Sequence, residues 1–335
     1  MLDADKQLDL EVEGERVHLT SLDRELWPKS KGHPAVTKRD LLAYYLQIGH
    51  IMLPHLHDRP LAFVRYPDGM GGERFFQKHW EKGRPDYIET ANIWTEVKSA
   101  RQDWLLCNNL PSLLWFAQMS SLEIHAWYSR ITPQPGLPSD FSTEGALEAS
   151  VLSYPDFMVF DLDPNLEDTE TTFNPAAYKR TKVVAQIVRE VLDEHHLQSF
   201  LKTSGKTGLH LFVPIRREYD YARVKDWAKR IGKEAEKRCP EDTTMVWSLQ
   251  KRPKKIFIDH NQNVRGKTLV AAYSTRPSPE ATVSMPIEWD DLDTVDPREF
   301  TIFTVPKHLE RTGDPWDRIL MRPQTLTVLG KASLI

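Results

Sequence analysis

The hydrophobic and polar residues of this chain recur with two different periods, which predict both strands and helices. Residues 8–20 alternate between apolar and polar around Gly14 and predict an opening β-hairpin. From Thr37 to about residue 53 the apolar positions recur at helical spacing, with Thr37 as the expected N-cap and Pro54 as the expected end of the helix.

The pattern continues as mixed helix and strand through residue 150. Residues 60–66 predict a strand that leads through a glycine-rich loop to Phe75 and Phe76. The apolar segment 104–127 predicts a helix followed by a strand. Residues 130–150 are rich in Pro, Gly and Ser, and they predict a surface loop that forms the seam between two lobes.

The second half of the chain contains two short apolar strands that each end in carboxylates. Residues 157–160 are all apolar and are followed by Asp161 and Asp163, and residues 256–258 are followed by Asp259. Because side chains alternate along a strand, Asp161 and Asp163 are expected to point to the same side.

Two helices and a hairpin complete the pattern and make the expected class α+β. The helices are predicted over residues 175–196 and 220–239. The turn 204–208 joins two strands, 200–203 and 209–214, so it is not a P-loop, in which a helix would follow the glycines.

Composition indicates a soluble globular protein with no membrane segment. The 335 residues are 40% hydrophobic and 27% charged, and no apolar run approaches the length of a membrane span. The acidic, polar start is not a signal peptide, so we expect a cytoplasmic protein. Cys107 and Cys239 have no metal-ligand or disulfide spacing.

Charge is distributed unevenly along the chain. The net charge of −4 taken alone argues against a protein that coats nucleic acid. A basic run nevertheless predicts one basic surface, although such runs are more often solvated loops. It comprises Lys251, Arg252, Lys254 and Lys255, followed by Arg265 and Lys267.

The Asp161–Asp163 pair has two interpretations. Two carboxylates this close repel each other unless a cation lies between them, and oxygen ligands favour Mg²⁺ or Mn²⁺. Alternatively, Asp163 caps the turn that follows. The second acid-tipped strand, at Asp259, favours a site for two divalent ions that performs phosphoryl transfer.

Basic and small residues could neutralise the phosphates of such a reaction. The candidates are the turn 204–208 with His210, and the side chains of Arg252 and Arg276. Phosphatases of the haloacid dehalogenase type and nucleotide-sugar transferases also use an Asp-x-Asp pair, but neither accounts for the second acid-tipped strand.

Aromatic residues in the first half could contact a nucleobase. Phe75 and Phe76 offer stacking faces, although an aromatic pair is more often part of a core.

Ordered motifs along nearly the whole chain resemble the polymerase domain of bacterial ligase D, a branch of the archaeo-eukaryotic primase superfamily. They are Arg65-Tyr-Pro-Asp-Gly with Phe75-Phe76-Gln-Lys78, Glu123-Ile-His125, Asp161-Leu-Asp163-Pro, Ser204-Gly205 to His210, Lys255 to Asp259 with Gln262-Asn263, Ala272-Tyr-Ser-Thr-Arg276, and Gly313-Asp-Pro-Trp316.

The resemblance implies roles for these residues. The metal ligands and catalytic residues would be Asp161, Asp163 and Asp259. The incoming nucleotide would be surrounded by Ser204, Gly205, Lys206, His210, Arg252, Gln262, Arg276 and His125. DNA would be contacted by Arg24, Lys38, Arg65, Phe75 and Phe76, with Arg24 and Lys38 at the 5′-phosphate of a gap or broken end.

The chain departs from the family pattern at two places. Arg24 replaces the usual lysine, and the segment 29–35 is a few residues longer. Thr207 stands where the family commonly has lysine, so Lys206 or another residue would have to reach the phosphates.

These observations predict a primase-like catalytic core with two lobes around a mixed or antiparallel sheet. We expect one two-lobed domain over residues 1–335, with lobes 1–130 and 151–335.

The expected function is template-directed nucleotidyl transfer in gap filling or end joining, with two Mn²⁺ or Mg²⁺ ions as cofactors. The substrates would be NTPs, which the resemblance favours, or dNTPs. A non-catalytic module that binds and holds DNA ends is the alternative. Ligase activity would come from a separate protein, and a Ku-like partner is expected only by analogy.

Overall fold

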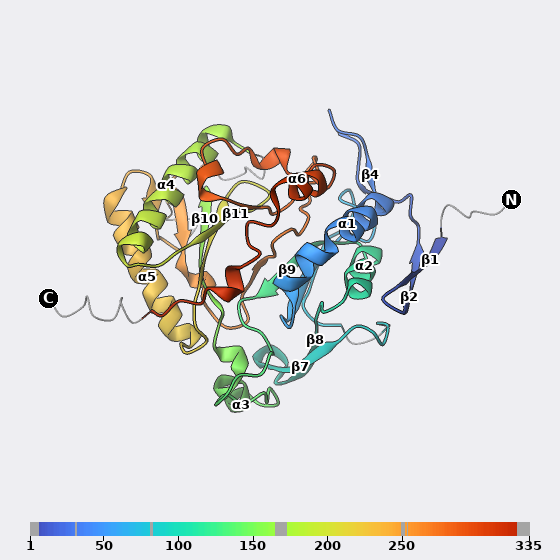
Figure 1. The fold of residues 1–335 in the computed structure, drawn as a ribbon, viewed down its shortest axis with the longest axis horizontal. Coiled ribbons are helices and arrows are strands. Elements are labelled where there is room, and N and C mark those ends of the chain that lie inside the picture. The colour runs from blue at the N-terminus through green and yellow to red at the C-terminus, as the bar shows by residue number, and fades with distance from the viewer. Residues whose placement is uncertain are drawn as a thin grey trace. The chain divides into compact units, whose positions relative to one another are not determined.

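The strands and helices of the computed structural model confirm the α+β class, and helices cover its sheets (Figure 1). The structure describes residues 7–30, 32–80, 83–164, 173–248, 252 and 254–326. They form two compact units. Unit 1 comprises Met1–Leu152, Thr268–Ser284 and Arg298–Gly313, and unit 2 comprises Ser153–Lys267, Met285–Pro297 and Asp314–Ile335. The expected lobe 151–335 differs from unit 2, because two of its segments belong to unit 1.

Unit 1 is built on a four-stranded antiparallel sheet in the order β15-β9-β5-β6. Its strands are β5 (Leu61–Arg65), β6 (Phe75–Gln77), β9 (Ser121–Trp127) and β15 (Thr268–Val270). Helix α1 (Lys38–Leu56) packs on α2 (Leu110–Gln118), and α2 contacts β9. The predicted strand from residue 268 therefore pairs with β9.

The start of α1 follows from its sequence, whereas its end does not. The Thr37 side chain accepts a hydrogen bond from the Asp40 amide, and the Asp40 carboxylate accepts one from the Thr37 amide at 2.8 Å. This capping box confirms Thr37 as the N-cap. The expectation that Pro54 ends the helix is wrong, because the helix continues to Leu56. A proline in the last turn removes only one intrahelical hydrogen bond.

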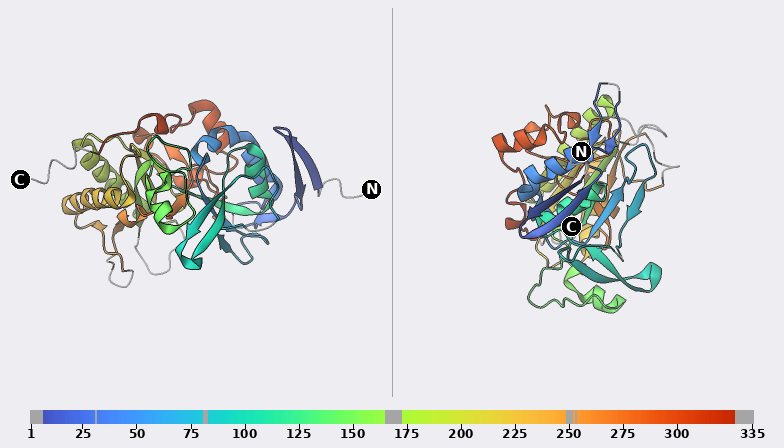
Figure 2. Two further views of the ribbon diagram at one scale, coloured as in Figure 1. Left: turned by 90° about the horizontal axis from the view of Figure 1, so that it is seen from below. Right: turned by 90° about the vertical axis from the view of Figure 1, so that its right-hand side faces the viewer.

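Three two-stranded ribbons and two further helices complete unit 1. The ribbons are β1 (Gln7–Val12) with β2 (Glu15–Thr20), β3 (Glu25–Trp27) with β4 (Val36–Thr37), and β7 (Thr90–Thr95) with β8 (Ala100–Leu105). The helices are α3 (Glu144–Ala149), inside the predicted loop 130–150, and α6 (Val305–Thr312). Figure 2 shows the first and last of these ribbons as separate hairpins, and the first confirms the predicted opening hairpin.

Unit 2 is built on a six-stranded mixed sheet in the order β13-β14-β10-β12-β11-β16. Its strands are β10 (Phe157–Pro164), β11 (Phe200–Thr203), β12 (Leu209–Pro214), β13 (Thr243–Thr244), β14 (Ile256–Asp259) and β16 (Pro286–Ile287). Only the pairing of β13 with β14 is parallel within this sheet. The two acid-tipped strands, β10 and β14, are direct neighbours.

Helices α4 (Pro175–Glu194) and α5 (Tyr221–Arg238) lie side by side and pack on β10 (Figure 1). The apolar stripe of α4 explains this packing, since Val184, Val188 and Val191 are fully buried. Val183 is 48% exposed because it lies one residue off the stripe.

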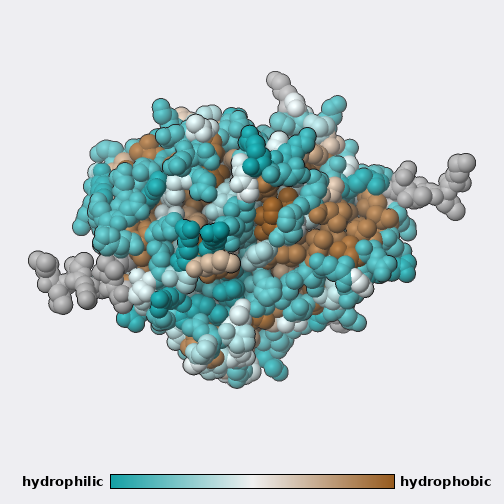
Figure 3. Space-filling view, viewed as in Figure 1, coloured by the Kyte–Doolittle hydropathy of each residue, from teal (hydrophilic) through white to brown (hydrophobic). Residues whose placement is uncertain are grey.

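Short 3₁₀ helices occupy several connections. They are Glu96–Lys98, Val151–Ser153, His260–Gln262, Trp289–Asp291, Pro297–Glu299 and Ile319–Met321. Among the described residues, every helix is too short or too polar to cross a bilayer. The face shown in Figure 3 is mostly hydrophilic, with a hydrophobic area over α1 and α2.

Candidate active site

Four polar side chains form a row across the sheet of unit 2. Strand register places Asp259 opposite Asp161, Asp161 opposite His210, and His210 opposite Lys202, on four adjacent strands. Directly opposed residues project from the same face of a sheet, so these side chains are lateral neighbours. We call them the polar row. Asp163 lies on the same side as Asp161, two residues further along β10.

The carboxylates at one end of the polar row interact through their charges. Asp161 is 7% exposed and Asp259 is 5% exposed. Burial, followed by the negative charge of Asp161 and a smaller contribution from Asp163, raises the pKa of Asp259 to about 6. The Asn261 amide donates to Asp259 Oδ1 at 2.8 Å, and Gln262 Nε2 donates to Oδ2 at 3.2 Å.

Such a group of carboxylates has the chemistry of a divalent-cation site. Oxygen donors suit Mg²⁺ and Mn²⁺, and a cation would relieve the repulsion that raises the pKa of Asp259. Within the part of the chain that the structure describes, however, no three His, Cys, Asp or Glu side chains meet in an arrangement that could hold an ion. Asp163, the third carboxylate, is exposed to solvent.

His210 is held between a lysine and an aspartate. Lys202 Nζ lies 2.7 Å from His210 Nδ1, and His210 Nε2 lies 3.3 Å from Asp161 Oδ1. An ammonium group has donors and no acceptor, so Nδ1 accepts from Lys202 and Nε2 carries a hydrogen toward Asp161. Lys202 is fully buried. We did not identify it from the sequence, although a lysine inside an apolar strand two residues before Ser204 was a usable signal.

The turn after Lys202 uses its own amides internally. Ser204 Oγ accepts hydrogen bonds from the amides of Lys206 at 3.1 Å and Gly208 at 2.9 Å, and Gly205 adopts a positive φ of 73°. The serine hydroxyl therefore already accepts the hydrogens of two backbone amides in this turn.

Gly208 brings this turn against the strand that carries the acids. A Cβ atom at residue 208 would lie 2.4 Å from the carbonyl oxygen of Leu162 and 3.4 Å from Asp163 Oδ1. Only glycine allows the two backbones to approach this closely. The turn therefore sits directly beside the Asp161–Asp163 pair.

Arg252 lies near the acids and is stacked on an aromatic ring. Its guanidinium carbon is 3.6 Å from the centroid of Phe257, and it donates to the carbonyl oxygens of Val246 and Trp247 at 3.1 and 2.9 Å. Burial lowers the pKa of Arg252, while the charges of Asp163 and Asp259 oppose that shift. The neighbouring Lys251 of the predicted basic run lies outside the described residues.

A second cluster lies in unit 1. Glu123 Oε2 is 2.9 Å from His125 Nε2 and 3.2 Å from a terminal nitrogen of Arg276, so one carboxylate holds both predicted nucleotide-binding residues. His125 therefore belongs to a polar cluster and is not an isolated core histidine. Glu123, which is 5% exposed, was part of a quoted motif, but we had given it no role.

Phe75 and Phe76 are on the surface. They are 48% and 55% exposed, which removes the alternative that the pair is part of a core. The ring of Phe76 meets that of His125 edge-on, with centroids 6.1 Å apart. Exposed rings beside polar groups can stack on nucleobases.

Arg65 is engaged within unit 1. Its Nε donates to the Met119 carbonyl at 3.0 Å, a terminal nitrogen donates to Gln77 at 2.8 Å, and the group lies 4.5 Å from the centroid of Trp80. These contacts tie β5 to β6, so Arg65 supports the strand that carries Phe75 and Phe76.

The two residues expected at a 5′-phosphate are close to each other in unit 1. Arg24 donates to the Pro67 carbonyl and lies 3.8 Å from Asp68. Lys38 is 3% exposed, and its ammonium group donates to the Thr20 carbonyl at 3.1 Å. Burial, followed by the charge of Arg24, lowers the pKa of Lys38 to about 8. An anion bound beside Lys38 would stabilise its charged form.

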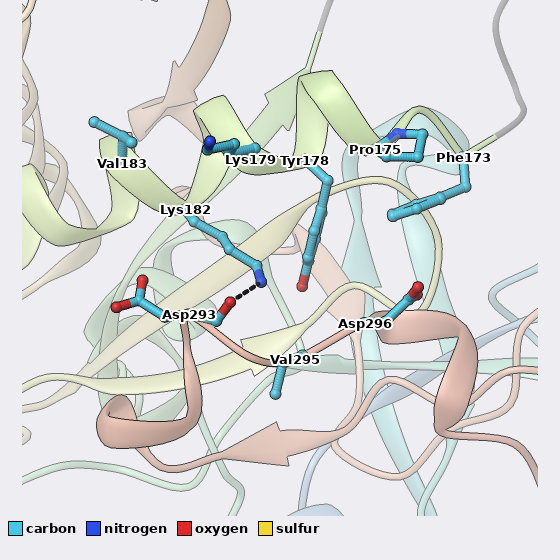
Figure 4. A pocket seen from close by; sticks show the side chains of 9 residues that line it. All are labelled: Phe173, Pro175, Tyr178, Lys179, Lys182, Val183, Asp293, Val295 and Asp296. Atoms are coloured by element: carbon cyan, nitrogen blue, oxygen red, sulfur yellow. Dashed lines mark hydrogen bonds between the residues drawn. The ribbon is translucent and has the colours of Figure 1, made fainter.

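A cavity of about 470 Å³ lies elsewhere in unit 2, against the start of α4 (Figure 4). Lys182 Nζ donates across it to the Asp293 carbonyl at 3.0 Å. The lining residues are Phe173, Pro175, Tyr178, Lys179, Lys182, Val183, Asp293, Val295 and Asp296. None of them is a predicted site residue, so this cavity is separate from the polar row.

Comparisons with known proteins agree with the resemblance found in the sequence. Residues 37–316 match the family described as LigD, primase-polymerase domain. The chain is 30% identical over 300 residues to the multifunctional non-homologous end joining protein LigD of Mycolicibacterium smegmatis, covering 90% of this chain and 35% of that protein. It is 31% identical over 284 residues to the protein of the same name from Pseudomonas aeruginosa, covering 84% of this chain and 30% of that one.

A solved structure has a similar fold. It is the polymerase domain from Mycobacterium tuberculosis ligase D in complex with DNA, with a TM-score of 0.77 and 29% sequence identity over 92% of this chain and 99% of that chain. The present chain spans about a third of the length of the two LigD proteins that it matches.

Proposed function

Because this chain belongs to the LigD primase-polymerase domain family, we propose that it is a template-directed nucleotidyltransferase that extends a primer during repair of gapped or broken DNA. The observation that supports this function best is the polar row, in which two acid-tipped strands are paired so that Asp161 opposes Asp259. Phosphoryl transfer requires such a concentration of carboxylates to hold the metal ions that neutralise the reacting phosphates.

Divalent ions bound by Asp161, Asp163 and Asp259 would activate the attacking hydroxyl and stabilise the leaving pyrophosphate. The protein's own groups would orient the nucleotide. His210 Nε2 presents a hydrogen on the face that carries the acids, and the Arg252 guanidinium supplies positive charge beside Asp163 and Asp259. Ser204, Gly205 and Lys206 lie on the turn beside them, and their contacts with the nucleotide are part of this proposal.

Further features of the family resemblance complete the proposal. Phe75 and Phe76 would stack on template bases, and Arg276 would contact the nucleotide. His125 and Gln262 are candidates for a preference for ribonucleotides. Ligation and a Ku-like end-binding partner would be supplied by other chains or other segments.

Primer extension on gapped, blunt and unprimed templates tests the function. We expect the wild-type protein to add the nucleotide complementary to the template in the presence of Mn²⁺ and to stop when EDTA removes the metal. Parallel reactions with NTPs and dNTPs measure sugar preference. End binding without any metal-dependent extension would instead favour the non-catalytic alternative.

Recognition of a 5′-phosphate should depend on pH through Lys38. Only the protonated amine attracts phosphate, and the lowered pKa of about 8 means that this form is lost as pH rises from 7 to 9. We expect the preference for a 5′-phosphorylated over a 5′-hydroxyl gap to fall by up to about tenfold over that range, in step with the protonated fraction of Lys38, as measured by fluorescence anisotropy.

Lys38→Met should remove this preference at every pH, whereas Lys98→Met, at an exposed lysine of unit 1, should leave it intact. If Lys38→Met lowers only the melting temperature and retains the preference, the buried ammonium has a structural role alone.

A further inference from the structure

Trp247 is unusual among the tryptophans of this protein. The chain contains ten, and Trp247, at 56% exposed, is the one that appears among the large exposed apolar side chains of the described residues. Exposing an indole to water is unfavourable, so an exposed tryptophan in a well-packed unit indicates a surface that contacts another molecule. The preceding Val246 is also exposed, at 40%.

The indole is held by aromatic and basic neighbours. Its centroid is 6.1 Å from that of Phe257, at an interplanar angle of 59°, and Lys267 Nζ lies 6.0 Å from its ring. The backbone carbonyl of Trp247 accepts a hydrogen bond from Arg252 at 2.9 Å. Arg252 stacks on the same Phe257 ring, so one guanidinium fixes the backbone at residues 246 and 247.

This group lies beside the carboxylates. In the register of β10 and β14, Phe257 is the direct partner of Asp163. The charges of Asp163 and Asp259 both act on Arg252. Trp247 therefore flanks the acid end of the polar row, with the positive charges of Arg252 and Lys267 close by.

We propose that Trp247 is a stacking platform for an unpaired nucleobase of the nucleic-acid strand that enters the polar row, with Lys267 and Arg252 attracting the phosphates of that strand. The combination of an exposed aromatic face and adjacent cations is what single-stranded nucleic acids recognise, since every base has a π-face and every linkage a charge. An apolar surface of a protein partner would be a poor match for an indole that lies close to two cationic side chains. The proposal deepens the proposed function and rests on it, because it takes the strand to be a substrate.

Binding of a fluorescently labelled oligothymidylate in the absence of metal tests the proposal. Trp247→Ala should weaken binding, measured by anisotropy, by about 5- to 150-fold, the range expected for loss of one base–aromatic stack. Trp247→Phe retains a ring and should bind nearly as well as wild type. Tryptophan emission should be quenched by unlabelled oligothymidylate in the wild type, and this component should be missing in Trp247→Phe.

Trp289→Phe is the matched control. Trp289 is half-buried in unit 2, where its Nε1 donates to the Ser199 carbonyl. Its loss should change neither the affinity for oligothymidylate nor the quenching of tryptophan emission by oligothymidylate. Wild-type affinity in Trp247→Ala, or an undiminished quench in Trp247→Phe, would overturn the proposal. An equal quench by thymidine triphosphate alone would also overturn it and assign Trp247 to the incoming nucleotide. Metal-dependent primer extension by the wild type is measured in parallel. If the wild type extends the primer, a negative binding result refutes the role of Trp247 alone and leaves the proposed polymerase function standing.

Discussion

Asp161→Asn is expected to reduce primer extension by about a thousandfold or more, because it removes the carboxylate that lies between Asp259 and His210 in the polar row. Asp161 is opposed by Asp259 on one side and by His210 on the other, so no neighbouring acid can replace it without a change of register. Single-turnover extension with Mn²⁺ measures the loss.

The same substitution should leave the fold and DNA-end binding intact. Asparagine has nearly the same shape as aspartate, and removing the charge of Asp161 relieves the repulsion that raises the pKa of Asp259. We therefore expect an unchanged or higher melting temperature and unchanged affinity for a gapped duplex. Asp226→Asn, on the exposed face of α5, is the matched control and should retain full extension. Extension at the wild-type rate by Asp161→Asn would show that the polar row is not the reaction centre.

Gly208→Ala is expected to cause the second largest loss, because the added methyl group has no space. Its carbon would lie 2.4 Å from the Leu162 carbonyl oxygen, a backbone atom that cannot rotate away. The turn and the strand of the acids must therefore separate, which typically costs about 1–3 kcal/mol. We expect a lower melting temperature together with a loss of extension of at least about tenfold, from displacement of the Asp161–Asp163 pair.

Thermal unfolding and extension should be measured on the same Gly208→Ala preparation. Gly145→Ala is the control, because residue 145 lies in helix α3 with nothing within 4 Å of an added Cβ. That substitution should be neutral or slightly stabilising, as alanine favours helix by about 0.5–1 kcal/mol over glycine. A Gly208→Ala protein with wild-type stability and activity would contradict the close approach that the structure shows.

Local patterns predicted much of the secondary structure. The apolar run 157–160, the helical stripe on α4 and the N-cap at Thr37 are properties of neighbouring residues, and each was recovered from the sequence. The errors occurred where local rules compete with context. Pro54 is tolerated inside α1, and the loop predicted over 130–150 contains α3.

The sequence predicted only part of the candidate site. Alternation along one strand placed Asp161 and Asp163 on one side, and the exposure of Phe75 and Phe76 was an open question until the packing was known. Lys202 and Trp247 were missed. One is a lysine hidden within an apolar strand, and the other lies in the connection between β13 and β14, so the significance of each depends on what lies next to it.

The amino-acid sequence by itself determined the α+β class, the two acid-tipped strands and the family to which the chain belongs, because these depend on residue order and local spacing. It could not determine which strands pair or in what register, since partners can be more than a hundred residues apart in the chain, as β9 and β15 are. Only the folded sheet sets Asp259, Asp161, His210 and Lys202 in one row, and only the packed turn shows why residue 208 has no side chain. Hydrogen bonding between strands and the exclusion of overlapping atoms act between distant residues, and these two forces assemble the acids and the basic groups into a candidate reaction centre.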